Sequence, residues 1–309
     1  MLLRIAPDTT VEDITISTVT RNEAVIRWQE RGPRSVEVEL VCQGGARILP
    51  SNVQTFFHSA VRYQRAYLTG LTPNTRYSLR FVSKTEQSWA EVERIFSTLP
   101  NPKGKCLARI ALISDPHLTR KRTYRKGRLL GASFKIFKEV IQTIEREKHD
   151  VVVIPGDVAD DGNEEVAYFH AKDCLAGFDG KSLILPGNRD NPRSMGSHFP
   201  ETLRPQVLQI HGWTLVGLDT STGKVGQDTQ LWLRNLLASK ETERMLIFSH
   251  FALAQHTGAQ PGQVVANEDS LQECMGMSNR IYGVFSGHRN AVFVDRSQKT
   301  AHVTCPQIV

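Results

Sequence analysis

The N-terminal part of the chain alternates between apolar and polar residues over short distances. An alternation with period two places the apolar side chains on one face of a β-strand, and short strands between turn residues are typical of a β-sandwich. We therefore predict an all-β domain over residues 1–99. The runs that carry this pattern are AVIRW (24–28), VEVELV (36–41), RAYLTGL (65–71), YSLRFV (77–82) and EVERIFST (91–98).

The pattern changes after PNPKGK at residues 100–105, which its proline and glycine residues mark as a linker. Beyond it, strand-like apolar runs alternate with segments whose apolar residues recur at helical spacing. This alternation predicts an α/β layer fold over residues 106–309. The expected helices are FKIFKEVIQTIEREK (134–148), EVAYFHAKDCLAGF (165–178) and QLWLRNLLASK (230–240).

One segment of the N-terminal part carries a more specific pattern. LTGLTPNTRYSLRF (68–81) resembles the corner of a fibronectin type III domain, with Leu71, Pro73 and Tyr77 in the expected order. The resemblance implies that the hydroxyl of Tyr77 anchors the corner. It also places Trp28 in the core of the sandwich, and neither aromatic residue is expected to have a catalytic role.

Five apolar runs in the C-terminal part end on residues that bind hard metal ions. In an open α/β sheet, ligands collect at the carboxyl ends of the strands, so residues that are distant in sequence are expected to meet at one edge. Three runs carry a glycine before the polar residue, which permits a sharp turn. The runs are ALISDPH with Asp115 and His117, VVVIPGD with Asp157, SLILPGN with Asn188, MLIFSH with His250 and YGVFSGH with His288.

The composition describes a globular protein of moderate positive charge. Of the 309 residues 40% are hydrophobic and 23% are charged, and the net charge is +6, which suits a folded core and two domains. Because much of this charge is local, a general nucleic-acid-binding surface is not expected. Either a solvated loop or attraction of an anionic substrate explains the basic run that follows DPH. Its basic residues are Arg120, Lys121, Arg122, Arg125, Lys126 and Arg128.

The cysteines favour a reducing compartment. Their odd number, without a CxxC pair, argues against a disulfide framework and against a cysteine zinc site. The apolar run at the start is too short for a signal peptide, and no stretch approaches the roughly 18 apolar residues of a membrane helix. We therefore expect a cytoplasmic protein without membrane association. The cysteines are Cys42, Cys106, Cys174, Cys274 and Cys305.

In order and spacing, the polar motifs resemble those of the calcineurin-like metallophosphoesterase family. That family has DxH, GDxx, GNH(D/E), a lone histidine and GHxH, and the resemblance implies two β-sheets flanked by helices over residues 106–309. A β-sandwich in front of such a domain is similar to purple acid phosphatases, whereas the LDTS segment and its spacing resemble bacterial cyclic-nucleotide and glycerophosphodiester phosphodiesterases. The matching segments are DPH (115–117), GDVA (156–159), GNRD (187–190), SHF around His250 and GHRN (287–290).

The resemblance implies a pair of divalent metal ions, of Mn, Fe, Zn or Mg. Asp115, His117 and Asp157 would hold the first, and Asp157 would bridge to the second. Asn188, His250 and His288 would complete the second site. A hydroxide between the metals would attack phosphorus, so the expected activity is hydrolysis of a phosphodiester or pyrophosphate bond in a small phosphorylated substrate.

Two residues depart from the family pattern. Asn290 stands where the family has the second histidine of GHxH, and an amide oxygen is a weaker ligand than imidazole for Zn or Fe. Arg189 stands where the family has a catalytic histidine. Arginine cannot practically donate its proton, but it neutralises charge and grips phosphate oxygens. We therefore expect Arg189 to act in catalysis on substrates whose leaving group needs no proton, and Asp190 to orient Arg189.

Two further functional interpretations remain open at this point. A degenerate member of the family would bind phosphate ligands or partners with little turnover, and Asn290 and Arg189 favour it. A nuclease would use the basic run, although the chain lacks the other basic clusters expected of one. Locally, Asp190 could instead cap a helix. His256 lies outside the motifs and is expected to be structural, while Asp219 either supports the site or is structural.

Overall fold

The computed structural model divides into two compact units, Met1–Lys105 and Cys106–Val309, which are described separately. None of the helices described below combines the length and the apolar character that crossing a membrane requires. The structure describes residues 3–6, 9–32, 37–42, 47–48, 52–58, 61–82, 91–121, 124–125, 128–239, 243–255, 262–276, 278–288, 293–295 and 300–305.

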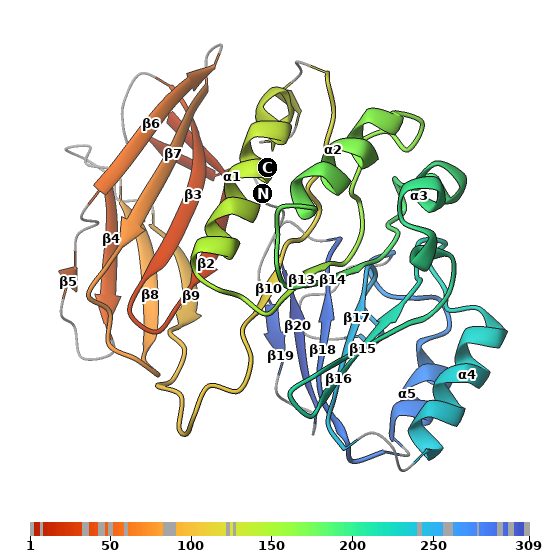
Figure 1. The fold of residues 1–309 in the computed structure, drawn as a ribbon. Helices are drawn as coiled ribbons and strands as arrows, with labels where there is room; N and C mark the ends of the chain where they lie inside the picture. Colours follow the sequence, from red (N-terminus) through yellow and green to blue (C-terminus); the bar gives the residue numbers. More distant parts are fainter. Residues whose placement is uncertain are drawn as a thin grey trace. The chain divides into compact units, whose positions relative to one another are not determined.

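The N-terminal unit consists of two antiparallel sheets, as the alternating sequence predicts (Figure 1). The five-stranded sheet has the order β1-β2-β3-β7-β6, with β1 (Leu3–Ala6), β2 (Thr9–Val19), β3 (Ala24–Arg31), β6 (Asn52–His58) and β7 (Val61–Leu68). The four-stranded sheet has the order β5-β4-β8-β9, with β4 (Glu37–Cys42), β5 (Arg47–Ile48), β8 (Arg76–Val82) and β9 (Glu91–Ser97).

The core of this unit contains the residues that were expected there. Trp28, Leu71 and Tyr77 are all buried in one apolar cluster that draws on both sheets. The backbone N–H of Thr72 donates a hydrogen bond of 2.7 Å to the hydroxyl of Tyr77, so this tyrosine anchors the turn before β8 from inside the core. The all-β prediction is confirmed, and the fibronectin type III identity stays a prediction.

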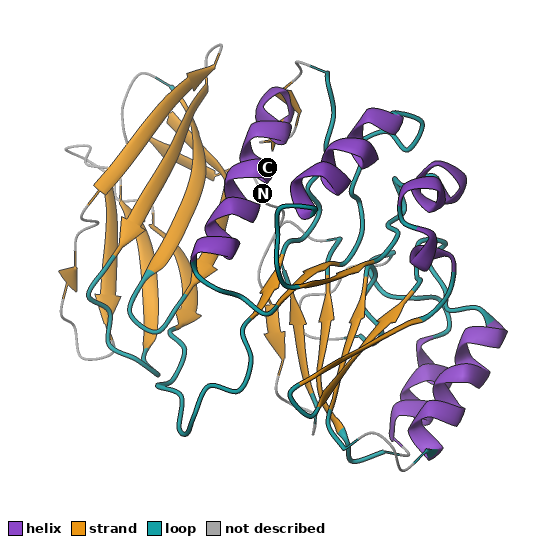
Figure 2. Ribbon diagram, viewed as in Figure 1, coloured by secondary structure: helices purple, strands orange, loops and turns teal. Residues whose placement is uncertain are grey.

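The C-terminal unit is an α/β fold with two larger sheets and a short hairpin (Figure 2). The three-stranded sheet is parallel, in the order β10-β13-β14, with β10 (Ile110–Leu112), β13 (Val151–Ile154) and β14 (Lys181–Ile184). The six-stranded sheet is mixed, in the order β15-β16-β17-β18-β20-β19, with β15 (Gln206–Ile210), β16 (Trp213–Leu218), β17 (Met245–Ser249), β18 (Ile281–Ser286), β19 (Phe293–Asp295) and β20 (Ala301–Thr304). The hairpin within the basic run pairs β11 (Tyr124–Arg125) with β12 (Arg128–Leu129).

Helices cover the outer face of each large sheet. Three helices lie against the three-stranded sheet and two against the six-stranded sheet, while Leu183, Leu215 and Phe248 belong to an apolar cluster between the sheets. This four-layer arrangement confirms the prediction of two sheets flanked by helices. The α-helices are α1 (Ser133–Arg146), α2 (Glu165–Leu175), α3 (Pro192–His198), α4 (Gln227–Ala238) and α5 (Glu268–Gly276), and the 3-10 helices are η1 (Leu130–Ala132) and η2 (Pro200–Leu203).

The three predicted helices correspond to α1, α2 and α4, whereas α3 and α5 were not predicted. The helix α3 is too short for a helical period to be recognised, and its start depends on a local cap. The side chain of Asn191 accepts hydrogen bonds from the backbone N–H groups of Arg193 and Ser194, and Pro192 occupies the first turn.

Candidate metal centre

Each of the five apolar runs forms a strand, and the polar residue follows the end of that strand. Asp115 and His117 follow β10, Asp157 follows β13, and Asn188 follows β14 in the three-stranded sheet. In the six-stranded sheet, His250 follows β17 and His288 follows β18. Because the strands within each set run parallel, these residues lie at the carboxyl edge of their sheet.

The loops at this edge adopt backbone conformations that most residues avoid. Asp115, His117, Asp157 and His288 all have positive φ angles, of 50°, 44°, 50° and 65°. Such conformations cost free energy in residues other than glycine and cluster at functional sites. These residues lie in loops that follow strands of both sheets, and the unusual conformations are consistent with loops whose shape brings the side chains together.

The loop that carries Asp157 requires a glycine at position 156. Its φ angle is +111°, and a Cβ atom there would lie 2.7 Å from Nδ1 of His250 and from Cα of Gly187. No larger residue fits between the two loops at this distance. The close approach brings the loop that carries Asp157 against the loop that carries Asn188.

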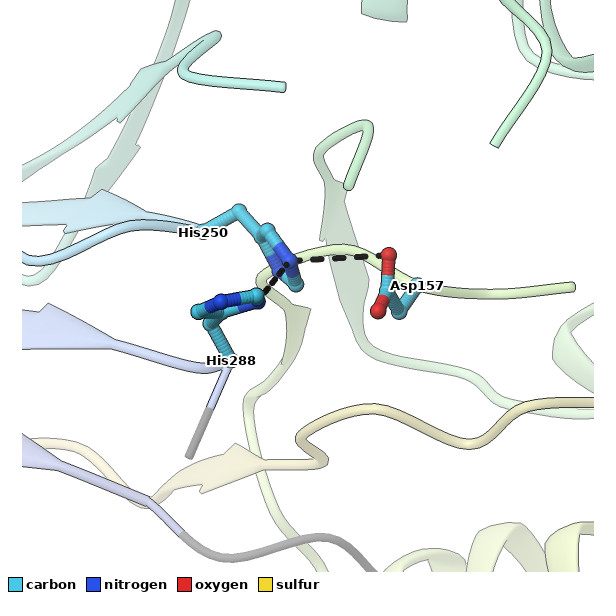
Figure 3. A group of neighbouring side chains, drawn as sticks. All are labelled: Asp157, His250 and His288. Carbon is cyan, nitrogen blue, oxygen red and sulfur yellow. Dashed lines mark hydrogen bonds and ion pairs between the residues drawn. The ribbon is translucent and has the colours of Figure 1, made fainter. Parts of the chain in front are cut away.

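Asp157, His250 and His288 form the first group of side chains (Figure 3). Nε2 of His250 lies 3.5 Å from Oδ1 of Asp157 and 3.1 Å from Nδ1 of His288. Oδ1 of Asn188 lies 2.9 Å from the same nitrogen. Carboxylate, imidazole and amide donors from four loops therefore converge on one place.

Asp115, His117 and Asp157 form the second group, whose potential ligand atoms lie within 4.8 Å of one another. Oδ2 of Asp157 is 3.7 Å from Nε2 of His117. Both carboxylate oxygens of Asp115 accept hydrogen bonds from the backbone N–H of His288, at 3.2 and 3.0 Å. Asp157 thus belongs to both groups and directs one oxygen toward each.

The chemistry of the donors fits divalent cations. Nδ1 of His250 lies 3.0 Å from the carbonyl oxygen of Pro155, which can only accept a hydrogen bond, so Nε2 presents a lone pair to the first group. Burial lowers the pKa of His250, which favours this neutral imidazole. Among the described residues, neither ring nitrogen of His117 finds a hydrogen-bond partner, although both are buried. Buried nitrogen and oxygen lone pairs that face one another are what a cation would satisfy.

Asp190 fastens two of the loops to each other. Its buried carboxylate accepts hydrogen bonds from the backbone N–H groups of Val158, Ala159 and Gly187, at 3.1, 3.0 and 2.8 Å. Burial raises the pKa of Asp190 to about 7, and the bonds from Ala159, Gly187 and Val158 act in the opposite direction. Because the carboxylate binds backbone N–H groups of the two loops, Asp190 is a positioning residue. That Asp190 orients Arg189 stays a prediction.

Arg189 enters the site through its backbone. Its N–H donates a hydrogen bond of 2.8 Å to Oδ1 of Asp157, while the residue as a whole is exposed. Asn290 and His256 lie outside the described residues. Asp219 is exposed and accepts a hydrogen bond from the N–H of Ser221, so its contact is a local turn.

Sequence reasoning missed several residues that hold the ligands in place. Tyr168 on α2 donates a hydrogen bond of 3.2 Å to Asp190, and burial raises the pKa of its hydroxyl, which keeps the donor protonated. Oδ1 of Asp160 lies 3.4 Å from Nδ1 of His117, which is an ion-pair contact without the geometry of a hydrogen bond. Thr220 accepts a hydrogen bond from the N–H of His250. Two of these residues lie close enough to a motif to have been noticed, since Asp160 directly follows GDVA and Thr220 belongs to LDTS.

Comparisons with known proteins point to one family. The profile of the calcineurin-like phosphoesterase family matches residues 108–289. The chain is 27% identical over 158 residues to the 3',5'-cyclic adenosine monophosphate phosphodiesterase CpdA of Escherichia coli (strain K12). The match covers 48% of this chain and 56% of that protein, so the chain spans little more than half the length of this relative.

A solved structure extends the likeness to the fold. The dimetal phosphatase from Danio rerio superposes with a TM-score of 0.55 at 14% sequence identity. The superposition covers 66% of this chain and 88% of the zebrafish chain. At this identity the likeness concerns the fold alone.

Proposed function

Because the chain belongs to the calcineurin-like phosphoesterase family, we propose that it hydrolyses a phosphodiester or pyrophosphate bond with the help of two divalent cations. The observation that carries this proposal is the position of Asp157. Its Oδ1 lies near His250 and its Oδ2 near His117. A single carboxylate between two ligand groups is the arrangement that a pair of cations requires.

Each cation has its own proposed ligands. Asp115, His117 and Asp157 would hold the first, and Asp157, Asn188, His250 and His288 would hold the second, with Asn290 as a further candidate for the first. When bound, such cations polarise a phosphoryl oxygen and lower the pKa of a bound water. The ligand set lacks thiolates, which favours Mn, Fe, Zn or Mg.

The residues of the chain supply positioning and charge. Asp190 holds the loop of Asp157 against the loop of Asn188 through three backbone hydrogen bonds. Arg189, beside Asp157, provides a guanidinium that neutralises charge on phosphate oxygens. Because this guanidinium does not release its proton near neutral pH, we propose that the substrate carries a leaving group that departs as a stable anion.

The substrate class follows from the same considerations. A cyclic-nucleotide phosphodiesterase is among the relatives, which supports a small phosphorylated substrate. Aryl phosphodiesters and pyrophosphates are favoured over simple alkyl phosphates, because an alkoxide leaving group is the one that most needs a proton.

The rival interpretation is a degenerate protein that binds phosphate ligands with little turnover. The geometry argues against it, because the ligand side chains still converge and Asp157 still faces both groups. The positive φ angles of these loops cost free energy, and such conformations cluster at functional sites, which favours a working catalytic site.

The test is a metal analysis combined with a substrate panel. The full chain would be purified with each candidate metal, its metal content measured by mass spectrometry, and its activity measured on bis(p-nitrophenyl) phosphate, p-nitrophenyl phosphate, cyclic AMP and a nucleoside diphosphate sugar. We expect about two equivalents of metal and hydrolysis that a chelator abolishes. Metal-loaded protein that cleaves none of these compounds would favour the degenerate interpretation.

A further inference from the structure

The turn that carries His250 is held by the buried hydroxyl of Thr220, in addition to the hydroxyl of Ser249, which donates a hydrogen bond of 2.8 Å to the carbonyl oxygen of Phe251. The strand β17 ends at Ser249, so the next backbone N–H groups lose their partners in the sheet. Oγ1 of Thr220 accepts hydrogen bonds from the N–H of His250 at 3.0 Å and from the N–H of Phe251 at 2.9 Å. A hydroxyl oxygen has two acceptor lone pairs, and here both are used on consecutive residues of one turn.

The position of Thr220 in the sheet explains this contact. Thr220 lies just beyond the end of β16, and β16 pairs in parallel with β17, so that Leu218 is opposite Ser249. The threonine therefore reaches the turn from the neighbouring strand end. Its exposed fraction is 0%, which means that water cannot replace its hydroxyl without a change in structure.

Phe251 extends the effect of this hydroxyl to the second histidine. The ring of Phe251 lies 4.2 Å from the ring of His288, centroid to centroid, with an angle of 34° between the planes. The same ring meets the ring of His250 at 5.2 Å and 87°. Phe251 is buried and thus limits how either imidazole can turn.

We infer that Thr220 is a positioning residue that sets the orientation of both imidazoles in the group Asp157, His250 and His288. It acts on His250 through the backbone and on His288 through the ring of Phe251. This inference rests on the proposed function, because it concerns the same group of ligands. Residues that orient metal ligands typically alter metal affinity by about 10- to 100-fold when they are lost.

The experiment measures Mn²⁺ binding to the full chain by titration calorimetry after treatment with a chelator. Thr220→Val keeps the shape of the side chain and removes the acceptor, and we expect it to weaken Mn²⁺ binding by about 10- to 100-fold. Thr220→Ser keeps the hydroxyl, and we expect affinity within about 3-fold of the wild type, since the acceptor is retained. Thr220→Ala removes the same acceptor and is measured in parallel in case the valine variant does not fold.

Thr214→Val is the matched control. Thr214 is also buried and lies on β16, but its hydroxyl donates to Gln209. We expect this variant to lose some stability and to bind Mn²⁺ as the wild type does. A Phe251→Leu variant tests the ring contact and is expected to weaken Mn²⁺ binding while Thr220 still holds the turn.

Three results would overturn the inference. They are wild-type Mn²⁺ affinity in folded Thr220→Val or Thr220→Ala protein, equal losses in Thr220→Ser and Thr220→Val, and an equal loss in Thr214→Val. Wild-type protein that binds no divalent metal would instead contradict the proposed function itself. The two failures are therefore distinguishable in one series of titrations.

Discussion

Nε2 of His250 lies 3.5 Å from Oδ1 of Asp157, and this contact joins the ends of two different β-sheets. Asp157 follows β13 in the three-stranded sheet, and His250 follows β17 in the six-stranded sheet. The centre is therefore assembled only when the sheets pack face to face. Changes at Asp157 and its neighbours test whether this junction is the site of chemistry.

Asp157→Asn is expected to abolish turnover while the protein still folds. The carboxylate must offset the charge of both proposed cations, and a neutral amide cannot. We expect a loss of at least about 10²-fold in kcat/KM, as is typical when electrostatic stabilisation of the transition state is removed. The measurement is hydrolysis of bis(p-nitrophenyl) phosphate with saturating Mn²⁺, together with the metal content of the purified variant.

Asp219→Asn is the control for this experiment, because Asp219 is exposed and its carboxylate accepts a hydrogen bond from the N–H of Ser221 in a local turn. It should keep nearly all activity. If Asp157→Asn also kept near wild-type activity with its metals bound, the two-metal assignment would be wrong.

The identity of the leaving group should depend on residue 189. We expect the wild-type enzyme to cleave an aryl phosphodiester far better than a matched alkyl one, since Arg189 cannot protonate an alkoxide. Arg189→His should improve the alkyl substrate relative to the aryl one. Arg189→Ala should weaken both by removing charge stabilisation. The comparison uses kcat/KM for both substrates in the three proteins, with metals saturating.

Arg193 provides the matched control for these variants, because it is also exposed and lies nearby at the start of α3. Arg193→Ala should leave the ratio of aryl to alkyl activity unchanged. Equal activity of the wild type on both substrates, with no change of the ratio in Arg189→His, would show that Arg189 does not act at the leaving group.

Asp190→Asn should destabilise the C-terminal unit and weaken metal binding together. An amide offers one acceptor oxygen, so its NH₂ group faces at least one of the backbone N–H groups that the carboxylate now satisfies. A buried group left without a partner costs about 1–3 kcal/mol. Urea unfolding in the presence of a chelator measures this loss apart from any contribution of bound metal.

Tyr168→Phe is the graded comparison for Asp190→Asn. It removes one hydrogen bond to the carboxylate and one from the N–H of Asn191, and a smaller loss of stability is expected because the backbone bonds to Asp190 remain. If both variants were as stable as the wild type, Asp190 would not hold the loops together.

The C-terminal unit should keep its metals without the N-terminal one. All candidate ligands lie in the unit Cys106–Val309. A truncated chain that begins at Lys103 should bind Mn²⁺ and cleave an aryl phosphodiester with kinetics close to those of the full chain. Loss of metal from a truncated chain that circular dichroism shows to be folded would mean that the N-terminal unit contributes to the centre.

Local sequence was sufficient for the strands and for the candidate ligands. A buried strand requires an unbroken apolar run, and its end requires a turn, so ALISDPH, VVVIPGD, SLILPGN, MLIFSH and YGVFSGH each carry their own structural signal. Burial of Trp28 and Tyr77 was predictable for the same reason, since alternation and the corner motif are local patterns. The helix α3 was missed because its start depends on one capping side chain, that of Asn191.

The contacts between these segments depended on tertiary structure. That Asp157 faces both His117 and His250 follows from the packing of two sheets, which no local pattern encodes. Asp190 was recognised as part of GNRD, but its partners Val158 and Ala159 belong to another loop. Thr220 belongs to the LDTS segment, but its role was not predictable, because a buried hydroxyl becomes significant only when a neighbouring strand ends beside it and leaves two N–H groups to be satisfied.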